Sequence, residues 1–269
     1  MNKNELAGYL KFAKNIALEA GKIMIKYFSG DNGSFYKFDN TIVTKADTEI
    51  NHYLIEQVKK TYPNHSIDGE EEQFGKSDYV WVCDPVDGTA VYARHIPVAV
   101  FSLALVVDGK SVVGVVYDPF TNNLYEATLG GGAYLNGTKI SVSNIPLDDM
   151  KSVSNFDMWP EAPYNTYDSI KELGARTYFL SLGSAIHGCM EVANGNFTFE
   201  IFSGTTHKNC DIAAAKIIVE EAGGKVTDLF GNEQRYDESI NGAVISNGLV
   251  HDEIINTIKK HLKNLKQAN

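Results

Sequence analysis

Apolar residues near the start of the chain recur at the spacing of an α-helix. Leu6, Leu10, Ala13, Ala17 and Ile23 are separated by three, four or six residues, which places them on one helical face. Charged residues interrupt this stretch, whereas a signal peptide needs an unbroken apolar segment. The pattern therefore predicts an amphipathic helix and argues against a signal peptide.

The following residues predict a turn, a second helix and then an antiparallel meander. Residues 29–34 form a Gly/Asn/Ser/Asp turn cluster, and a helix over residues 46–60 ends before Pro63, which cannot continue the hydrogen-bond ladder. The apolar run 79–83 stops at an Asp-Pro pair, as a buried strand does where it meets a turn. Further strands are expected over residues 99–107 and 111–117, which flank an Asp-Gly hairpin turn, and over 124–128, 132–135 and 138–142.

The second half of the chain alternates between helical and extended patterns. Composition changes near residues 144–149, which predicts an α+β half over residues 1–145 and an α/β half over 146–269. Residues 157–168 are expected to form an irregular surface segment. Helices are expected over residues 183–193, 211–222 and 252–265, and strands over 196–199, 225–228 and 243–246. This order predicts helices that cover a mixed sheet.

Composition and net charge argue against several classes of protein. The 269 residues are 43% hydrophobic and 22% charged, an ordinary globular balance, and 34 acidic against 24 basic residues give a net charge of −10. An acidic surface disfavours nucleic acid as a direct partner, and the longest apolar run, residues 98–107, is too short to span a membrane. Three cysteines without a Cys-x-x-Cys pair suit reduced thiols, so we expect a cytoplasmic protein.

The hexapeptide Asp-Pro-Val-Asp-Gly-Thr over residues 84–89 carries the strongest chemical signal. Asp84 and Asp87 can face one point, where their repulsion is costly unless a cation such as Mg²⁺ neutralises them. Gly88 permits close approach of a ligand, and the amides of Gly88 and Thr89 would attract phosphate. An exposed turn without function explains the hexapeptide alone equally well.

Three other acidic positions help to decide between a metal site and an exposed turn without function. Glu70 belongs to a glutamate run that is ordinarily a solvated loop, and Asp47 follows Thr44 at a spacing that a helix cap alone would explain. Asp211 opens a helix that is apolar on nearly every side, so we expect it to be buried and to need a counter-ion. Read together, these acids favour a metal site.

These motifs resemble the inositol monophosphatase family, part of a superfamily of metal-dependent, lithium-sensitive phosphatases that includes fructose-1,6-bisphosphatases. The matching segments keep the family's order and cover almost the whole chain: Val-Thr-Lys-Ala-Asp at 43–47, Gly-Glu-Glu at 69–71, Trp-Val-Cys-Asp-Pro-Val-Asp-Gly-Thr at 81–89, His-Ile-Pro at 95–97, Gly-Ser-Ala at 183–185, Asp-Ile-Ala-Ala at 211–214 and Glu-Ala-Gly-Gly at 221–224. The resemblance implies a five-layer α/β/α/β/α sandwich and a homodimer.

The resemblance also implies a set of metal ligands. Glu70, Asp84 and the Val86 carbonyl would hold one Mg²⁺, and Asp84 would bridge to a second ion completed by Asp87 and Asp211. Glu70 would help to hold a weaker third ion, and Mn²⁺ is a possible substitute. Most of these ligands belong to residues 1–145, whereas Asp211 belongs to 146–269 together with the loop expected on the substrate side.

The remaining implied roles concern catalysis and substrate binding. Thr89, hydrogen-bonded to Asp47, and Glu70 would position and deprotonate a metal-bound water, without a covalent phosphoenzyme. Gly88 and Thr89 would contact the phosphate, and Glu200 stands near the position where the family binds substrate hydroxyls with an acidic residue. His207 is a further residue close to Asp211 in the sequence.

Departures from the family pattern concern the substrate. Val91, Leu180 and Cys210 stand where the family often has Asn, Arg and Trp, and residues 201–210 form a longer segment than in the inositol enzymes. Cys210 is interpreted as a space-filling thiol. We expect a Mg²⁺-dependent phosphomonoesterase acting on myo-inositol monophosphate or a similar small polyol or sugar phosphate.

Several alternatives to that function remain open. The chain could be a fructose-1,6-bisphosphatase or have both activities, and a nucleotide 3′-phosphatase or a histidinol-phosphate phosphatase is less favoured. A non-catalytic regulatory binding protein belongs to another class, since some relatives act in RNA-polymerase complexes. All the presumed metal-binding carboxylates are present, which favours an enzyme.

Overall fold

The computed structural model describes residues 1–269 except 31, 38–40, 159–161, 205–208 and 266–269, and side chains only as far as residue 262. Asp31 of the expected 29–34 turn and His207 therefore lie outside the described residues. Two helices open the chain, α1 (Lys3–Phe28) and α2 (Lys45–Thr61), as predicted. The Asn2 side chain accepts hydrogen bonds from the amides of Asn4 and Glu5, which explains where α1 begins.

An eight-stranded sheet follows these two helices. Its order is β10-β9-β8-β7-β6-β5-β3-β4, and neighbouring strands from β5 to β10 are antiparallel, which confirms the predicted meander. The parallel neighbour of β5, β3, and the edge strand β4 were not predicted. The bounds are β3 (Ser66–Gly69), β4 (Gln73–Phe74), β5 (Tyr79–Asp87), β6 (Val100–Val107), β7 (Lys110–Asp118), β8 (Asn123–Thr128), β9 (Gly132–Leu135) and β10 (Thr138–Lys139). A small ribbon pairs β1 (Phe35–Tyr36) with β2 (Ile42–Val43).

A five-stranded sheet with order β12-β11-β13-β15-β14 occupies the second half of the chain. β11 is parallel to β12 and β13, whereas β15 is antiparallel to β13 and β14. The bounds are β11 (Val153–Asp157), β12 (Tyr178–Leu180), β13 (Phe199–Phe202), β14 (Lys225–Thr227) and β15 (Ala243–Ser246), with helices α4 (Tyr167–Gly174), α5 (Ala185–Ala193), α6 (Cys210–Glu221) and α7 (His251–Leu265).

The sequence located part of this second half correctly. The helices α5, α6 and α7 and the strands β14 and β15 are confirmed. The strand expected over 196–199 begins three residues later, at Phe199, because residues 194–197 turn back on the end of α5 through backbone hydrogen bonds. The irregular segment expected over 157–168 was wrong at both ends, since Asp157 ends β11 and Tyr167 begins α4.

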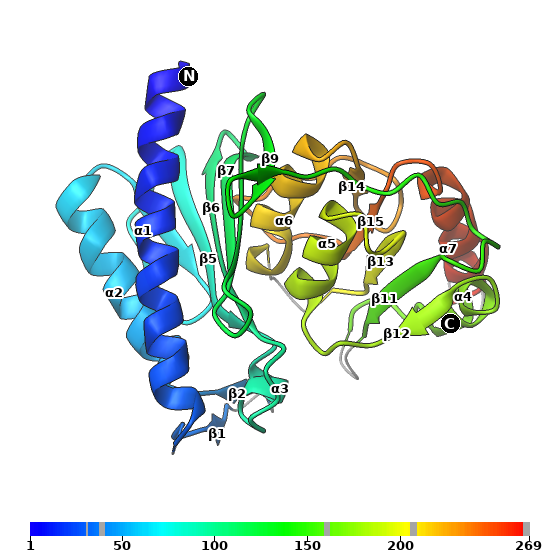
Figure 1. The fold of residues 1–269 in the computed structure, drawn as a ribbon, viewed down its shortest axis with the longest axis horizontal. Helices are drawn as coiled ribbons and strands as arrows, with labels where there is room; N and C mark the ends of the chain where they lie inside the picture. The colour runs from blue at the N-terminus through cyan, green and yellow to red at the C-terminus, as the bar shows by residue number, and fades with distance from the viewer. Residues whose placement is uncertain (31, 38–40, 159–161, 205–208, 266–269) are drawn as a thin grey trace.

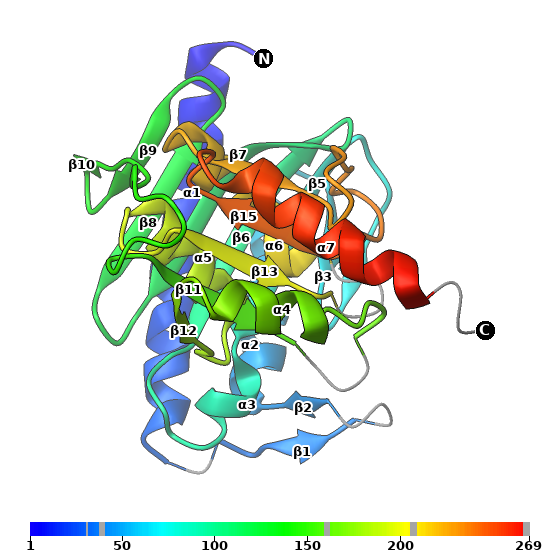
Figure 2. The same cartoon turned by 90° about the vertical axis from the view of Figure 1, so that its right-hand side faces the viewer.

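Five layers stack along the long axis of the molecule (Figure 1). Helices α1 and α2 cover the outer face of the eight-stranded sheet, and α5 and α6 lie between the two sheets. Helices α4 and α7 cover the outer face of the five-stranded sheet, as the turned view shows (Figure 2). The expected five-layer α/β/α/β/α sandwich is confirmed.

The alternation of side chains along β6 explains the layering. Phe101, Leu103 and Leu105 pack toward α1 and α2, whereas Val100 and Ala104 pack toward α5 and α6. Both faces of the central strands are therefore buried, which is why their sequence is almost continuously apolar.

Helix α6 lies especially close to the eight-stranded sheet. A Cβ atom on Gly114 of β7 would lie 2.5 Å from Ile217 Cγ2 and 2.8 Å from the Ala214 carbonyl oxygen, so only glycine permits this approach. Ser111 Oγ also donates a hydrogen bond to the Ala213 carbonyl at 2.6 Å. The core cluster around α6 contains residues from both halves of the chain, and the division at residue 145 stays a prediction.

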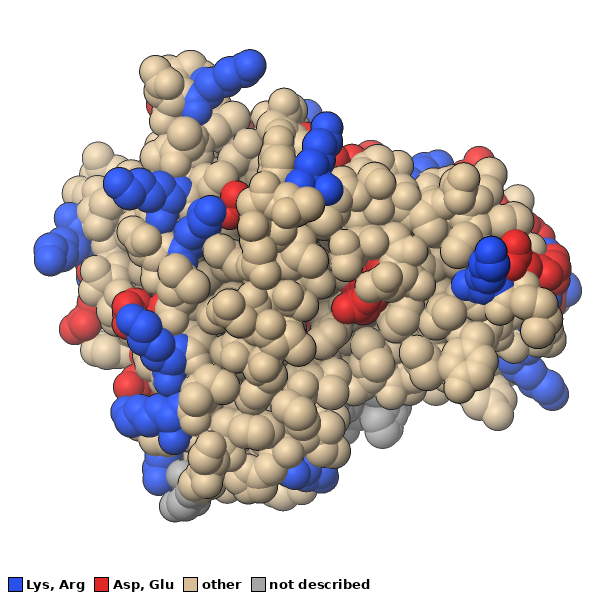
Figure 3. Space-filling view, in the orientation of Figure 1, with Lys and Arg blue, Asp and Glu red and all other residues tan. Residues whose placement is uncertain are grey.

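Charge is distributed unevenly over the molecule. On the face drawn in Figure 3, Lys and Arg side chains gather mainly on the side of α1 and α2, and much of the middle is uncharged. Several carboxylates are instead buried, each at most 7% exposed: Asp47, Asp84, Asp87, Asp118, Asp157, Glu200, Asp211 and Asp228. Among the described residues, no helix is long and apolar enough to cross a membrane.

Candidate metal centre

A bulge in β5 brings two carboxylates to the same side of the eight-stranded sheet. In a regular strand, residues three apart such as Asp84 and Asp87 point to opposite faces. The pairing with β6 shifts register between these two residues, and Val86 joins the core beneath α1 and α2. The expectation that this strand stops at Asp84 was wrong, because pairing with β6 resumes at Asp87 after the bulge.

The end of β5 turns sharply into a short helix, α3 (Thr89–Tyr92). Gly88 has a φ of 85°, the left-handed conformation that glycine adopts without strain. A Cβ atom there would also lie 3.0 Å from Ser184 Cβ and 3.1 Å from the Gly183 carbonyl oxygen. Glycine at this position therefore permits both the turn and the close approach of the loop before α5.

Asp84 and Asp211 come together although they belong to different sheets and helices. One ligand atom of each, together with Cys210 Sγ, lies within 4.8 Å of the others, and all three residues are buried. Asp84 Oδ1 accepts a hydrogen bond from the Val86 amide at 3.0 Å, and Cys210 Sγ donates to Asp211 Oδ1 at 3.7 Å. The thiol interpreted from the sequence as space-filling thus borders this acidic pair.

Asp87, the last residue of β5, approaches the same region from beyond the bulge. Its Oδ2 accepts hydrogen bonds from Ser184 Oγ and, at 2.8 Å, from the Ile186 amide in the first turn of α5. Burial, together with the charges of Asp211 and Asp157, raises the pKa of Asp87 to about 7 against the lowering effect of these donors. The helix terminus orients this carboxyl but does not neutralise its acidic neighbours.

A second acidic group lies on the α2 side of the site. Ligand atoms of Asp47, Glu70 and Glu71 lie within 4.8 Å of one another. Asp47 caps α2, since its Oδ2 accepts hydrogen bonds from the Thr44 amide at 2.8 Å and the Thr44 hydroxyl at 2.5 Å. Burial, and then the charge of Glu70, raises the pKa of Asp47 to about 7. Capping and membership of the acidic group are therefore compatible roles.

Thr89 connects Asp47 of the second group to the bulge of β5. Its hydroxyl lies 2.8 Å from the Val86 carbonyl oxygen and 3.4 Å from Asp47 Oδ1, so the shorter hydrogen bond goes to the carbonyl. The implied ligands are thus divided: Asp84 lies with Asp211, Asp87 faces Asp211, and Glu70 lies with Asp47. The roles implied for them stay predictions.

The donor set fits hard divalent cations. Carboxylate and carbonyl oxygens are the ligands that Mg²⁺ and Mn²⁺ accept. Asp84, Asp211 and Asp47 are buried, whereas Glu70 and Glu71 are of intermediate exposure. Burial of several acids together is costly, and bound cations would relieve that cost. The structure therefore presents two adjacent acidic groups able to hold metal ions.

Comparison with known proteins agrees with this geometry. A sequence model of the inositol monophosphatase family matches residues 5–263. This chain belongs to the inositol monophosphatase family. It is 33% identical over 254 residues to a fructose-1,6-bisphosphatase/inositol-1-monophosphatase of Thermotoga maritima, covering 93% of this chain and 96% of the relative.

Two further proteins are similar to this chain. The Nus factor SuhB of Escherichia coli strain K12 is 33% identical over 232 residues, covering 82% of this chain and 85% of SuhB. The solved structure of a Thermotoga maritima IMPase superposes with a TM-score of 0.84 at 30% identity, covering 96% of this chain and 99% of that structure. The family thus includes relatives named for phosphatase activity and relatives named as Nus factors.

Glu200 lies deeper in this family member than a substrate contact would suggest. Its carboxyl is fully buried between β13, β11 and α5, and Oε1 accepts a hydrogen bond from Asn155 Nδ2 at 3.0 Å. Burial raises the pKa of Glu200 well above its usual value. Oε2 has no hydrogen-bond partner within the described part of the chain, and a Cβ atom on Gly188 would lie 1.8 Å from it.

Sequence reasoning assigned no function to two residues that the fold places here. Ser184, in the matching Gly-Ser-Ala segment, holds Asp87, and Asp157 faces Asp211 and Asp87 from the end of β11. The sequence Val-Ser-Asn-Phe-Asp of residues 153–157 does not alternate between apolar and polar residues, so its local pattern gives no signal for a strand that ends at Asp157. Residues 205–208 of the longer segment before Cys210 lie outside the described residues.

Proposed function

We propose that this protein is a Mg²⁺-dependent phosphomonoesterase that hydrolyses a small polyol or sugar phosphate, with myo-inositol monophosphate as the leading candidate. The observation that carries this proposal is the approach of the buried Asp84 and Asp211 carboxylates to within 4.8 Å from separate parts of the fold. Membership of the inositol monophosphatase family supports the same reaction class.

The metal-binding residues in this proposal are Asp84, Asp87, Asp211, Glu70 and the Val86 carbonyl, holding two or three ions, with Mn²⁺ as a substitute. Bound divalent ions would stabilise charge on the phosphate and lower the pKa of a coordinated water. Asp84 and Asp211 are already close together, and Ser184 fixes the orientation of Asp87. The protein therefore supplies oriented oxygen donors and excludes bulk water from most of them.

The chain's own groups also supply a proton acceptor. Thr89 Oγ1 lies between the Val86 carbonyl and Asp47 Oδ1, so this hydroxyl can orient a water while it donates its own proton to either oxygen. The Asp47 pKa of about 7 is near the pH at which a general base works best. Together with Glu70, which lies in the same acidic group, Asp47 would hold the proton removed from the water.

Relatives suggest two alternatives to this function. The Thermotoga maritima relative is named for both fructose-1,6-bisphosphatase and inositol-1-monophosphatase activity, which supports sugar bisphosphates as a second substrate class. The likeness to Nus factor SuhB supports a binding role as the alternative from another class. The homodimer and the cytoplasmic location stay predictions.

Phosphate release from a small panel of sugar phosphates tests the proposal. With Mg²⁺, the protein should hydrolyse myo-inositol 1-phosphate or fructose 1,6-bisphosphate, and EDTA should abolish the release. Asp211→Asn should lose this activity, whereas Glu238→Gln, which changes an exposed acid in the same half, should keep it. A folded protein that binds Mg²⁺ but releases no phosphate from the panel would favour the binding role.

A further inference from the structure

Three polar side chains of the five-stranded sheet face α5. The register pairs Asn155 with Glu200 and Asp157 with Phe202 across the parallel strands β11 and β13. Phe156, Phe199 and Ile201 pack toward α4 and α7 on the opposite face. Because successive side chains alternate, Asn155, Asp157 and Glu200 all point toward the α5 side.

Asp157 and Glu200 differ in what lies above them. Gly188, near the middle of α5, lies directly over the Glu200 carboxyl and Asn155 Nδ2. Asp157 is two residue pairs farther along the strands, toward their carboxyl ends, and its electrostatic neighbours are Asp211 and Asp87. Asp87 itself is bound to the first turn of α5. The helix therefore covers Glu200, whereas Asp157 borders the acidic site.

The Asp157 carboxylate lacks any donor of its own. It is 7% exposed, and within the described ranges no side chain or amide donates a hydrogen bond to it. Its pKa is raised to about 7 by burial and then by Asp211. Within the described part of the chain, the charged groups that face it are all acidic: Asp87, Asp211 and Glu200. A bound ligand that donates hydrogen bonds to this carboxylate would relieve the cost of burying it among them.

Asp157 belongs to neither of the two acidic groups whose ligand atoms lie within 4.8 Å of one another. It is therefore placed beside the Asp84–Asp211 pair and not among the atoms that would share an ion with it. Carboxyl ends of parallel strands are also where α/β sheets ordinarily bind ligands.

We propose that Asp157 is a specificity-determining residue that accepts hydrogen bonds from hydroxyl groups of a phosphorylated polyol bound at Asp84 and Asp211. This inference rests on the proposed function and replaces Glu200 by Asp157 as the acidic residue that contacts the substrate. A carboxylate has two oxygens and can accept from two neighbouring hydroxyls at once. The substrate class it selects is a polyhydroxylated phosphate monoester.

Binding measurements separate this role from metal binding. We compare the parent, Asp157→Asn, Asp157→Ala and, as a control, Asp168→Asn, which changes an exposed acid of α4. Calorimetry with Ca²⁺ in place of Mg²⁺, under conditions without phosphate release, gives the Kd of myo-inositol 1-phosphate and of inorganic phosphate. The Asp157 variants should raise the first Kd by about 10- to 100-fold, the worth of charge-assisted hydrogen bonds, and change the second less than about 3-fold. Asp168→Asn should change neither.

Kinetics provide a second readout with Mg²⁺. Asp157→Asn should lower kcat/KM for myo-inositol 1-phosphate about 10-fold or more while p-nitrophenyl phosphate, which has no hydroxyl beside the phosphate, is hydrolysed at nearly the parent rate. An equal loss for both substrates or for inorganic phosphate binding would overturn the proposal. So would a hydroxyl-specific loss in Glu200→Gln without one in Asp157→Asn, or dependence on Asp157 only for an amine-bearing phosphate such as histidinol phosphate.

The two proposals fail in different ways. If the parent binds myo-inositol 1-phosphate more tightly than inorganic phosphate but hydrolyses none of the panel, the proposed function fails while the binding series still decides the role of Asp157. If the parent hydrolyses the panel and Asp157→Asn binds both ligands as the parent does, only the inference about Asp157 fails. Because asparagine has the size of aspartate, folding of that variant is expected and circular dichroism checks it.

Discussion

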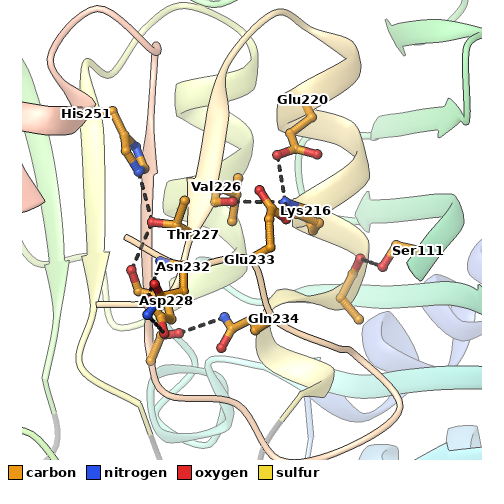
Figure 4. Close-up of polar contacts among 12 residues, drawn as sticks. Ser111, Lys216, Glu220, Val226, Thr227, Asp228, Asn232, Glu233, Gln234 and His251 are labelled. Atoms are coloured by element: carbon orange, nitrogen blue, oxygen red, sulfur yellow. Dashed lines mark hydrogen bonds and ion pairs between the residues drawn. The ribbon is translucent and has the colours of Figure 1, made fainter. Parts of the chain in front are cut away.

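The first turn and the middle of α6 place buried charge in opposite surroundings. Asp211 in the first turn lies against Asp84 and faces Asp87, so acid meets acid. Five residues on, Lys216 is 9% exposed, and its Nζ donates to the Val226 carbonyl at 2.9 Å, to Glu220 at 2.7 Å and to Glu233 at 2.6 Å (Figure 4). The same helix thus carries an acid that faces other acids in its first turn and a lysine with three acceptors near its middle.

Polar groups near Lys216 also find their hydrogen-bond partners within the chain. His251 bonds through Nε2 to Thr227 at 2.9 Å and through Nδ1 to Ser246 at 2.8 Å, and burial lowers its pKa to about 4, so it is neutral. Asp228 Oδ1 accepts from the amides of Phe230 at 2.8 Å and Asn232 at 2.7 Å. Here the chain satisfies its own buried polar groups.

The comparison distinguishes buried polar groups that stabilise the fold from the polar groups of the candidate metal centre. Where a buried charge only holds the fold together, partners from the same chain complete it. In the candidate metal centre, burial and neighbouring acids raise the pKa values of Asp47 and Asp87, and such shifted values are typical of functional sites. Substitutions in the candidate metal centre and in the polar network around Lys216 should therefore change different measured quantities.

Asp84→Asn should have the largest effect. It removes a carboxylate of the acidic pair, so Mg²⁺-dependent phosphate release should fall about 10³-fold or more, since a metal contributes several kcal/mol to transition-state stabilisation. Because one of several crowded charges disappears, the melting temperature without metal should not fall. Phosphate assays and thermal unfolding with EDTA measure the two effects.

Asp228→Asn is the matched variant from the other region. It weakens acceptors of two amides, so we expect a lower melting temperature and nearly unchanged turnover below it. Substantial turnover in Asp84→Asn would remove Asp84 from the set of ligands, and a loss of activity in folded Asp228→Asn would break the distinction between the regions.

Stabilisation by Mg²⁺ should depend on pH. The pKa values of Asp47 and Asp87 in the folded protein are about 7, above the unfolded value of 3.8, so between these values the metal-free native state holds more protons than the unfolded state. Its stability contribution from these groups falls as pH rises from about 4 to about 7. Mg²⁺ binds the ionised form of its proposed ligand Asp87, so its stabilising effect should be larger at pH 8 than at pH 5, by about 3 kcal/mol from this one group. Urea unfolding with Mg²⁺ and with EDTA at both pH values measures this, and an equal Mg²⁺ effect contradicts it.

Thr89→Ala should reduce the chemical step without comparable loss of binding. The variant removes the hydroxyl that lies between the Val86 carbonyl and Asp47, so kcat should fall about 10²-fold while KM stays within about 3-fold. Thr89→Ser retains the hydroxyl and should recover most of the rate. Equal kcat in Thr89→Ala and the parent rejects an orienting role.

Lys216→Met should have the smallest effect, and only on stability. Removal of Nζ leaves the Val226 carbonyl buried, but Glu220 and Glu233 are partly exposed and can turn to solvent, so we expect a loss of about 1 to 2 kcal/mol. Lys225→Met, which breaks an exposed pair with Asp252, should cost less than about 0.5 kcal/mol. Urea unfolding ranks the two, and a similar cost for both would mean that the buried network is not special.

The sequence predicted the regions in which local pattern and burial agree. The amphipathic repeat of α1, the Asp-Gly turn between β6 and β7 and the apolar α6 were all recognisable because packing reinforces their local preferences. The bulge between Asp84 and Asp87 was not, because it depends on pairing with β6.

Non-local contacts also limited the prediction of the site. A family resemblance implied Asp84, Asp87 and Asp211, but local reasoning placed Asp157 on an irregular surface because Pro160 and Pro163 nearby are turn residues. Only the pairing of β11 with β13 shows that Asp157 ends a buried strand beside Asp211. The short strands β3, β4 and β12 have too few residues to show a period.

The position of α6 between the sheets has a consequence for the integrity of the molecule. Residues of the second half pack against Gly114 and Ser111 of the first sheet and form part of its inner core. A fragment ending near residue 145 would expose that face to water, and a fragment starting there would lose both the covering sheet and Asp84. We therefore expect neither segment to fold and function without the other. If the chain is split near residue 145, activity should require both segments in the same cell.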